Sequence, residues 1–228
     1  MAQGQDHTLK AFDQDIVTLR GLISQMGGMA EEAIEQAMRA LQRGDAELAA
    51  EVKAADAKID AIEAEVERMA VRTIALRAPM ANDLREVVAA LKIAGVVERI
   101  GDYAKNIAKR VPQIESEHRI EPISILPAMA KMAAEMVHDV LDAFAARDAH
   151  AALSICERDD ALDDFYDSIF RTLVTHMVEN PKTISQVAHL LFVAKNLERI
   201  GDHATNVAEM VYFAATGTRM ADREKAHG

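Results

Sequence analysis

The chain has 228 residues and a formal net charge of −11, and 50% of it is hydrophobic, with three Tyr, six Phe and no Trp. This apolar content excludes a disordered chain, and the excess of acidic over basic residues excludes extended contacts with nucleic acid. The single cysteine, Cys156, excludes an internal disulfide and is typical of a reducing compartment. No run approaches the ~18 apolar residues of a membrane span and no signal peptide is recognisable, so we expect a cytoplasmic protein without direct membrane insertion.

Apolar residues recur at helical spacing along almost the whole chain, in a composition rich in good helix formers. In the first half, three helices are predicted, from about Leu9 to Gly44, from Asp45 to Ala78, and from Asn82 or Asp83 to about Val111. Asp45 is expected to cap the second helix, because a carboxylate at this position accepts a hydrogen bond from a free backbone N–H. Pro79 and Pro112 follow the second and third helices, as is common after a helix end.

Residues 112–127 contain three prolines, which is too many for a helix interior and indicates a linker. Three more helices are predicted after it, over roughly 126–146, 149–177 and 182–214. Short turns between long helices make antiparallel neighbours. We therefore predict an all-α fold, a tandem repeat of two antiparallel three-helix bundles, with domains at 1–118 and 119–228.

The two halves carry the same motif at an offset of 100 residues. Residues 98–108 read ERIGDYAKNIA and residues 198–208 read ERIGDHATNVA, so eight of eleven positions are identical. In the earlier helices the offset is 103, which pairs Asp56 with Asp159 and Asp60 with Asp163. The sequence is therefore an internal duplication.

Within the motif, carboxylates continue a row of otherwise apolar residues. Glu98 and Asp102 lie on the face that begins with Leu84, and the second copy repeats this arrangement. The second and fifth predicted helices each carry an Asp-x-x-x-Asp row that can face it. The candidate site residues are therefore eight carboxylates, four in each half: Asp56, Asp60, Glu98, Asp102, Asp159, Asp163, Glu198 and Asp202.

Buried like charges require a positive partner, and Arg99, Arg199 or a metal ion are the candidates. Carboxylates suit iron, manganese, magnesium or calcium, and they also bind zinc. The alternative is that the acids, with Glu63 beside Asp60, form an ordinary solvated helix surface. Gly101 and Gly201 each cost ~1 kcal/mol in a helix interior, which indicates a close helix approach with or without a ligand.

The repeated motif, together with Asp83-Leu84-Arg85 and the segment from His203 to Gly217, resembles the PhoU family. The resemblance covers nearly the whole chain. It implies a non-enzymatic negative regulator of the phosphate regulon and of phosphate uptake. It also implies partners, namely the ATPase subunit of a phosphate ABC transporter and a phosphate-sensing histidine kinase, and a homodimer. The implied cofactor is a multinuclear cluster of iron or zinc, with manganese or magnesium as alternatives, held by the eight carboxylates.

The alternative function is a carboxylate-bridged, metal-dependent hydrolase acting on phosphate compounds. The sequence shows no nucleophile–base pair and no evident general acid for such a reaction. A ferritin-like di-iron site is excluded because it needs Glu-x-x-His, and Gly101 and Gly201 stand where the histidines would be. Among the histidines only His203 could reach a metal, and its counterpart Tyr103 argues against that role. We therefore expect a non-enzymatic adaptor.

Overall fold

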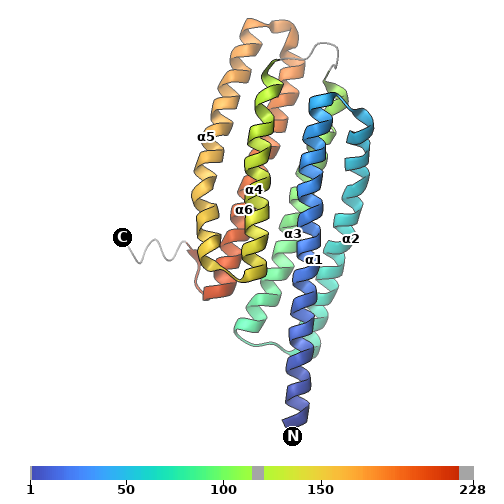
Figure 1. Ribbon diagram of the computed structural model, residues 1–228, viewed down its shortest axis with the longest axis vertical. Helices are drawn as coiled ribbons and strands as arrows, with labels where there is room; N and C mark the ends of the chain where they lie inside the picture. Colours follow the sequence, from blue (N-terminus) through green and yellow to red (C-terminus); the bar gives the residue numbers. More distant parts are fainter. Residues whose placement is uncertain (1, 115–120, 221–228) are drawn as a thin grey trace, which may run out of the picture.

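The computed structural model describes residues 2–114 and 121–220, and in this part of the chain it contains six long helices and no strand. The long helices are α1 (Ala2–Arg43), α2 (Ala46–Arg77), α3 (Asn82–Ala108), α4 (Leu126–Ala146), α5 (Ala149–Glu179) and α6 (Ile184–Thr216) (Figure 1). Three short 3-10 helices, η1 (Val111–Gln113), η2 (Glu121–Ile125) and η3 (Pro181–Thr183), lie between them. The predicted all-α fold class is confirmed. The predicted domain boundary between residues 118 and 119 lies outside the described residues.

The helix ends follow the capping residues in two places. The Asp45 side chain accepts a hydrogen bond from the Leu48 N–H (3.0 Å), as predicted. Asp148 does the same for α5 through the N–H groups of His150 (2.9 Å) and Ala151 (3.0 Å). These side chains satisfy backbone donors that the first helical turn leaves free.

The third helix departs from the prediction at both ends. Its N-cap is Ala81, without a side-chain cap hydrogen bond, and Asn82 instead accepts a hydrogen bond from the Arg85 side chain. It ends at Ala108 and not at Val111, because Pro112 lacks an N–H and Val111 starts a 3-10 turn. The first helix also begins at Ala2, earlier than the predicted Leu9.

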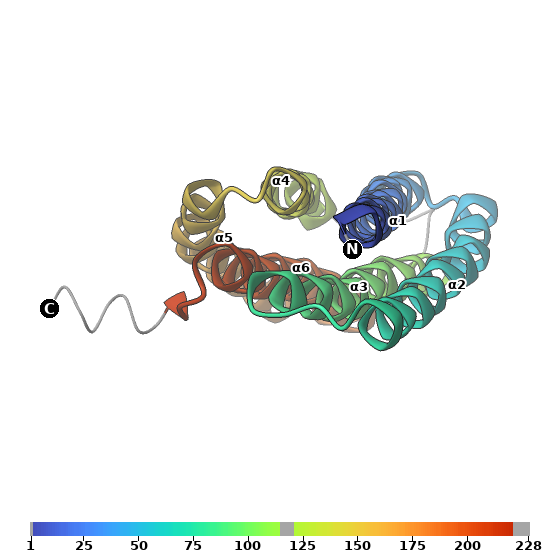
Figure 2. The same ribbon diagram turned by 90° about the horizontal axis from the view of Figure 1, so that it is seen from below.

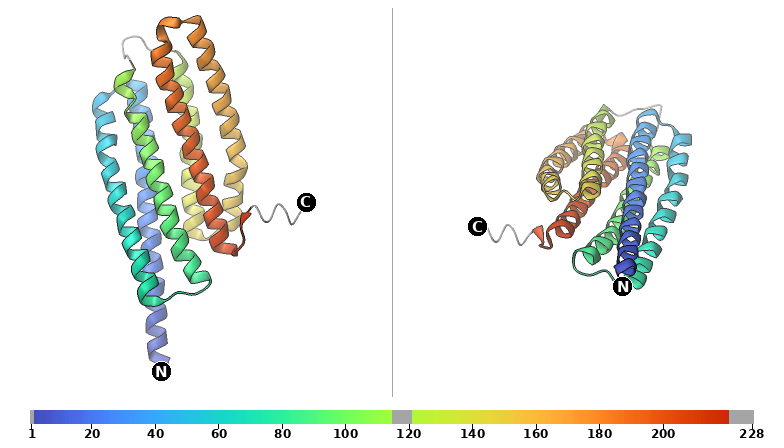
Figure 3. Two further views of the ribbon diagram at one scale, coloured as in Figure 1. Left: turned by 180° about the vertical axis from the view of Figure 1, so that it is seen from behind. Right: turned by 60° about the horizontal axis from the view of Figure 1, so that its bottom comes forward.

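The two three-helix halves pack side by side and share one hydrophobic core. Seen along the helices, α1 lies beside α4, α3 lies beside α6, and α2 and α5 form the two outer edges (Figure 2). From behind, α2, α3, α6 and α5 follow one another across the molecule (Figure 3). Apolar side chains at helical spacing fill the interior, for example Leu19, Ile23 and Met26 of α1, which are fully buried. None of the described helices is long and apolar enough to cross a membrane.

One buried carboxylate joins the halves. Glu86 of α3 is 5% exposed, and it accepts hydrogen bonds from Arg20 of α1 and Arg147 at the end of α4. Arg147 has a left-handed backbone conformation (φ 57°), and Gly44 holds the equivalent position in the first half (φ 66°). The periodicity of the sequence did not reveal this contact, because its three residues belong to three different helices.

Candidate metal centres

The acidic rows of α2 and α3 face each other at the position of Gly101. A Cβ atom added to Gly101 would lie 2.9 Å from Ile59 Cδ1 and 3.7 Å from Asp56 Oδ1. In the second half, a Cβ atom on Gly201 would overlap Leu162 Cδ2 and would lie 3.6 Å from Asp159 Oδ1. The close helix approach predicted from the two glycines is therefore confirmed, and it brings the carboxylates of neighbouring helices together.

The first acidic cluster consists of Asp56, Asp60, Glu63, Glu98 and Asp102. A lysine bridges its two helices: Lys105 Nζ donates to Asp56 of α2 and to Asp102 Oδ1 of α3 (2.7 Å). Asp56 is 7% exposed, so its charge is compensated mainly by this ammonium group. The two hydrogen bonds raise the pKa of Lys105, which keeps the side chain protonated.

The other carboxylates of the first acidic cluster repel one another electrostatically. Burial, followed by the charges of Asp102 and Glu63, raises the pKa of Glu98. Burial and the charge of Asp56 raise the pKa of Asp60, although Asp60 itself is exposed. These shifts show that the four predicted carboxylates of this half lie within electrostatic range of one another.

The second acidic cluster consists of Asp159, Asp163, Glu198 and Asp202. Oxygen atoms of Asp163, Glu198 and Asp202 lie within 4.8 Å of one another. Burial, followed by the charge of Asp163, raises the pKa of Asp159. Burial, followed by the charge of Glu198, raises the pKa of Asp163. Residues from α5 and α6 thus converge as the repeat predicts.

A second lysine, Lys195, borders this cluster. It precedes the motif carboxylate Glu198 by three residues, whereas Lys105 follows Asp102 by three. Lys195 Nζ donates to Glu198 Oε1 and lies 5.2 Å from the centre of the Tyr166 ring. Glu198 Oε2 and Asp159 Oδ1 are buried and have no hydrogen-bond partner among the described residues. The second acidic cluster therefore keeps two buried acceptor atoms available.

The arginines proposed as partners of the acids lie elsewhere. Arg199 is stacked over Tyr103 at 5.8 Å, and Arg99 is exposed. Among the described residues neither arginine forms an ion pair with these carboxylates, whereas Lys105 donates to Asp56 and Asp102 and Lys195 donates to Glu198. A metal ion, the other candidate, stays a prediction. Both lysines stand three residues from a motif carboxylate on the same helix, and this spacing is the signal that could have identified them.

His203 lies at the contact between the halves. Its ring meets the ring of Tyr103 edge to face, with 5.1 Å between the centroids. Burial, followed by the charge of Arg99, lowers the pKa of His203.

The donor set of both clusters fits a hard metal ion. Carboxylate oxygens from two helices converge, and those of the second acidic cluster include two buried atoms without a partner. Burying a carboxylate oxygen without compensation is unfavourable, and a cation relieves that cost. Such oxygens suit iron, manganese or magnesium and also bind zinc. In the first acidic cluster Lys105 already supplies part of the compensation.

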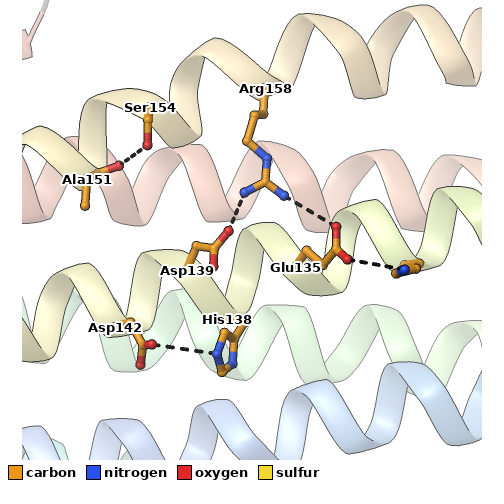
Figure 4. A network of polar contacts seen from close by, with 8 residues as sticks. Glu135, His138, Asp139, Asp142, Ala151, Ser154 and Arg158 are labelled. Carbon is orange, nitrogen blue, oxygen red and sulfur yellow. Dashed lines mark hydrogen bonds and ion pairs between the residues drawn. The ribbon is translucent and has the colours of Figure 1, made fainter.

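A groove of about 760 Å³ lies along the seam of α1 and α4, on the face opposite α3 and α6. Arg158 of α5 reaches over to this edge and pairs with Asp139 and with Glu135 (3.8 Å) (Figure 4). His138 points toward Asp142 (3.7 Å) and also contacts Glu31 of α1 (3.2 Å). The seam is therefore polar at its surface, with charges of both signs.

Comparison with known proteins agrees with this architecture. A family model described as the PhoU domain matches the chain twice, at residues 23–111 and 126–211. The chain is 54% identical to a Zymomonas mobilis protein named "Phosphate-specific transport system accessory protein PhoU homolog", over 96% of this chain and 92% of that protein. It is 44% identical to a Caulobacter vibrioides protein of the same name, over 96% and 95% of the two chains.

Solved structures show the same arrangement of helices. The crystal structure of PhoU from Pseudomonas aeruginosa superposes with a TM-score of 0.87 at 36% identity, covering 91% of this chain and all of that one. The phosphate transport system regulatory protein PhoU from Streptococcus pneumoniae gives a TM-score of 0.86 at 28% identity, over 92% and 99% of the chains. With two copies of the domain and this agreement in sequence and fold, the chain belongs to the PhoU family.

Proposed function

We propose that this protein is an accessory regulator of a phosphate-specific transport system. The observation that carries the proposal is the 54% identity, over 219 residues, to a protein named for that role. At high phosphate the protein restrains uptake and keeps phosphate-starvation genes repressed. The names of the relatives describe accessory proteins and no reaction, so the hydrolase alternative is not proposed.

The regulator acts as an adaptor between two partners in the cytoplasm, the ATPase subunit of the transporter and the phosphate-sensing histidine kinase. Long helices present extended surfaces for such contacts, and the polar groove between α1 and α4 is one of them. The homodimer remains a prediction. Light scattering on the purified chain tests it directly.

A deletion strain tests the regulatory role. In medium rich in phosphate, a reporter of a phosphate-starvation promoter should be derepressed in the deletion strain and repressed again by the wild-type gene. Gly28→Ala is a suitable control for complementation, because a Cβ atom there meets no atom within 4 Å. Normal repression in the deletion strain contradicts the proposal.

Co-purification tests the adaptor role. Tagged protein from cells at high phosphate should retain the transporter ATPase subunit and the sensor kinase, and the amounts should change at low phosphate. Tagged protein of an unrelated helical bundle serves as the control. If neither partner is enriched at either phosphate level, the adaptor role is wrong even where the genetic effect is present.

We also propose that the acidic clusters bind metal ions, with iron or zinc first and manganese or magnesium as alternatives. The support is chemical, because carboxylates from two helices lie close together in each half. Two buried oxygens of the second acidic cluster also have no hydrogen-bond partner in the part of the chain that the structure describes. Asp56, Asp60, Glu98 and Asp102 would hold the ions in the first half. Their counterparts would do so in the second half, namely Asp159, Asp163, Glu198 and Asp202.

Metal analysis of the purified protein tests this second proposal. We expect bound iron, zinc or manganese, and we expect Asp102→Ala combined with Asp202→Ala to reduce it. Asp142→Ala is the matched control, because its carboxylate is exposed on α4 and belongs to neither cluster. An unchanged metal content in the double variant means that the site is assigned wrongly.

A further inference from the structure

The two acidic clusters differ in where their lysines stand. At an offset of 100 residues, Lys105 of the first repeat corresponds to Thr205 of the second, and Lys195 of the second corresponds to Gly95 of the first. Each repeat therefore has one lysine beside its carboxylates, at positions on opposite sides of the motif. The duplication made two similar sites, and the lysines make them unequal.

Lys105 occupies the centre of its cluster. Its ammonium group donates to Asp56 on α2 and to Asp102 on α3, so it connects the two helices that would supply metal ligands. Its side chain is 24% exposed and that of Asp56 is 7% exposed. A metal ion that binds Asp56 and Asp102 through these oxygens must first displace the ammonium group from both of them.

Lys195 leaves the second acidic cluster more open. It donates to a single oxygen, Glu198 Oε1, and its ammonium group also lies over the Tyr166 ring. Glu198 Oε2 stays buried without a hydrogen-bond partner among the described residues, and so does Asp159 Oδ1. The position equivalent to Lys105 is held by Thr205, whose uncharged hydroxyl faces the Asp159 carboxylate. The oxygens of Asp163, Glu198 and Asp202 remain close enough to share one ion.

We propose that Lys105 is a built-in cation that makes the first acidic cluster the weaker of two metal sites, so that the second acidic cluster fills first. This inference rests on the metal binding proposed above. Glu63 gives the first acidic cluster a fifth carboxylate, where the second repeat has Tyr166. The charge of Glu63 attracts cations from a distance. It does not free the oxygen atoms of Asp56 and Asp102 that Lys105 binds, and a metal ion needs those oxygens free in order to coordinate them.

Exchanging the residue types at positions 105 and 205 tests the inference. In the full chain, stripped of metal by a chelator, Mn²⁺ binding is followed by the electron paramagnetic resonance signal of the free ion. We expect a tight and a weak class of sites that differ by about tenfold or more, the effect of one charged hydrogen bond. Lys105→Thr should strengthen the weak class toward the tight one, and Thr205→Lys should weaken the tight class.

Further variants assign the classes and control for charge. Asp102→Ala should remove the weak class, and Asp202→Ala the tight class. Lys109→Thr is the matched control, because Lys109 is the exposed C-cap residue of the same helix, one turn after Lys105, and its ammonium group donates to Asn106 (3.0 Å). Both classes should stay unchanged in this variant. Lys105→Met keeps the apolar stem without the charge, so it gives the same reading if the threonine variant folds poorly.

The outcomes distinguish a failure of the proposed role of Lys105 from a failure of metal binding itself. If the wild type and all variants bind no Mn²⁺, and metal analysis also finds none, metal binding itself is wrong. If the wild type binds Mn²⁺ in one uniform class, or if Asp102→Ala removes the tight class, only the role of Lys105 is wrong. If Lys105→Thr and Lys105→Met both leave the weak class unchanged in well-folded protein, Lys105 does not set the difference.

Discussion

Tyr103 of α3 and His203 of α6 occupy the same position in the two repeats, and their rings contact each other edge to face at 5.1 Å. A contact between equivalent residues places the approximate twofold axis of the molecule at this point. Arg199 stacks on Tyr103, while its equivalent Arg99 acts on His203 by charge. At the centre of the interface the two repeats therefore place equivalent positions in contact, but the residues at these positions differ in their chemistry.

Removing the tyrosine ring should weaken the association of the halves. We expect Tyr103→Ala to lower the free energy of unfolding by about 2 kcal/mol, because it removes an aromatic pair, a cation–π contact and half-buried apolar area. Urea unfolding followed by circular dichroism measures this. His203→Tyr keeps an aromatic pair and should cost less. Equal stability of Tyr103→Ala and the wild type contradicts the prediction.

Glu86 should be a larger determinant of stability than any surface acid. Glu86→Ala leaves Arg20 without its partner next to the core, and the loss expected for breaking a buried ion pair is about 3 kcal/mol. The matched control is Glu135→Ala, because Glu135 is itself exposed, and the effect of this substitution should stay below about 1 kcal/mol. Similar midpoints for both variants in urea would show that the Glu86 contacts are not stabilising.

Gly201 of the motif should respond oppositely to Gly28 of α1. Gly28→Ala should raise stability by about 0.5–1 kcal/mol, because alanine favours the helix and the new Cβ atom has open space. Gly201→Ala should lower stability, because the new Cβ atom overlaps Leu162, which is fully buried. Thermal unfolding of the two variants ranks them. A rise for both would mean that α5 moves away from α6 at little cost.

The helices, and the close approach of the acidic faces within each half, could be predicted because they depend on local sequence patterns. Apolar spacing and a few breakers placed all six helices, and the repeated glycine beside the acids predicted the close approach at Gly101 and Gly201. The two lysines were missed for a physical reason. The repeat comparison emphasises positions that agree, whereas Lys105 and Lys195 stand where the halves differ. Lys105 also reaches a carboxylate on another helix, Asp56 of α2.

The contacts between the halves could not be predicted. The pairing of α1 with α4 and of α3 with α6 depends on how two complete bundles dock, which no local period encodes. Glu86 illustrates this, since its partner Arg147 belongs to the other half and lies 61 residues away in the sequence. The missing cap of α3 has a different, local origin, because Asn82 accepts a hydrogen bond from the Arg85 side chain three residues later on the same helix.

The pKa of His138 should report on the seam between α1 and α4. The charge of Glu31, followed by its hydrogen bond, raises this pKa above the usual value of about 6.5. The protonated imidazole therefore stabilises the fold at pH values below about 6.5, and this contribution is lost as the pH rises through the folded-state pKa. The side chain is 58% exposed, so the effect should be small and should weaken with added salt.

Nuclear magnetic resonance titration of the His138 ring gives the pKa directly. Glu31→Gln should lower it toward the usual value, whereas Glu32→Gln should leave it unchanged, because Glu32 pairs with Gln36 on the exposed side of α1. His189 provides an internal reference, since burial and the nearby Arg110 lower its pKa. A pKa of His138 that stays the same in Glu31→Gln would mean that α1 and α4 are not joined by this pair in solution.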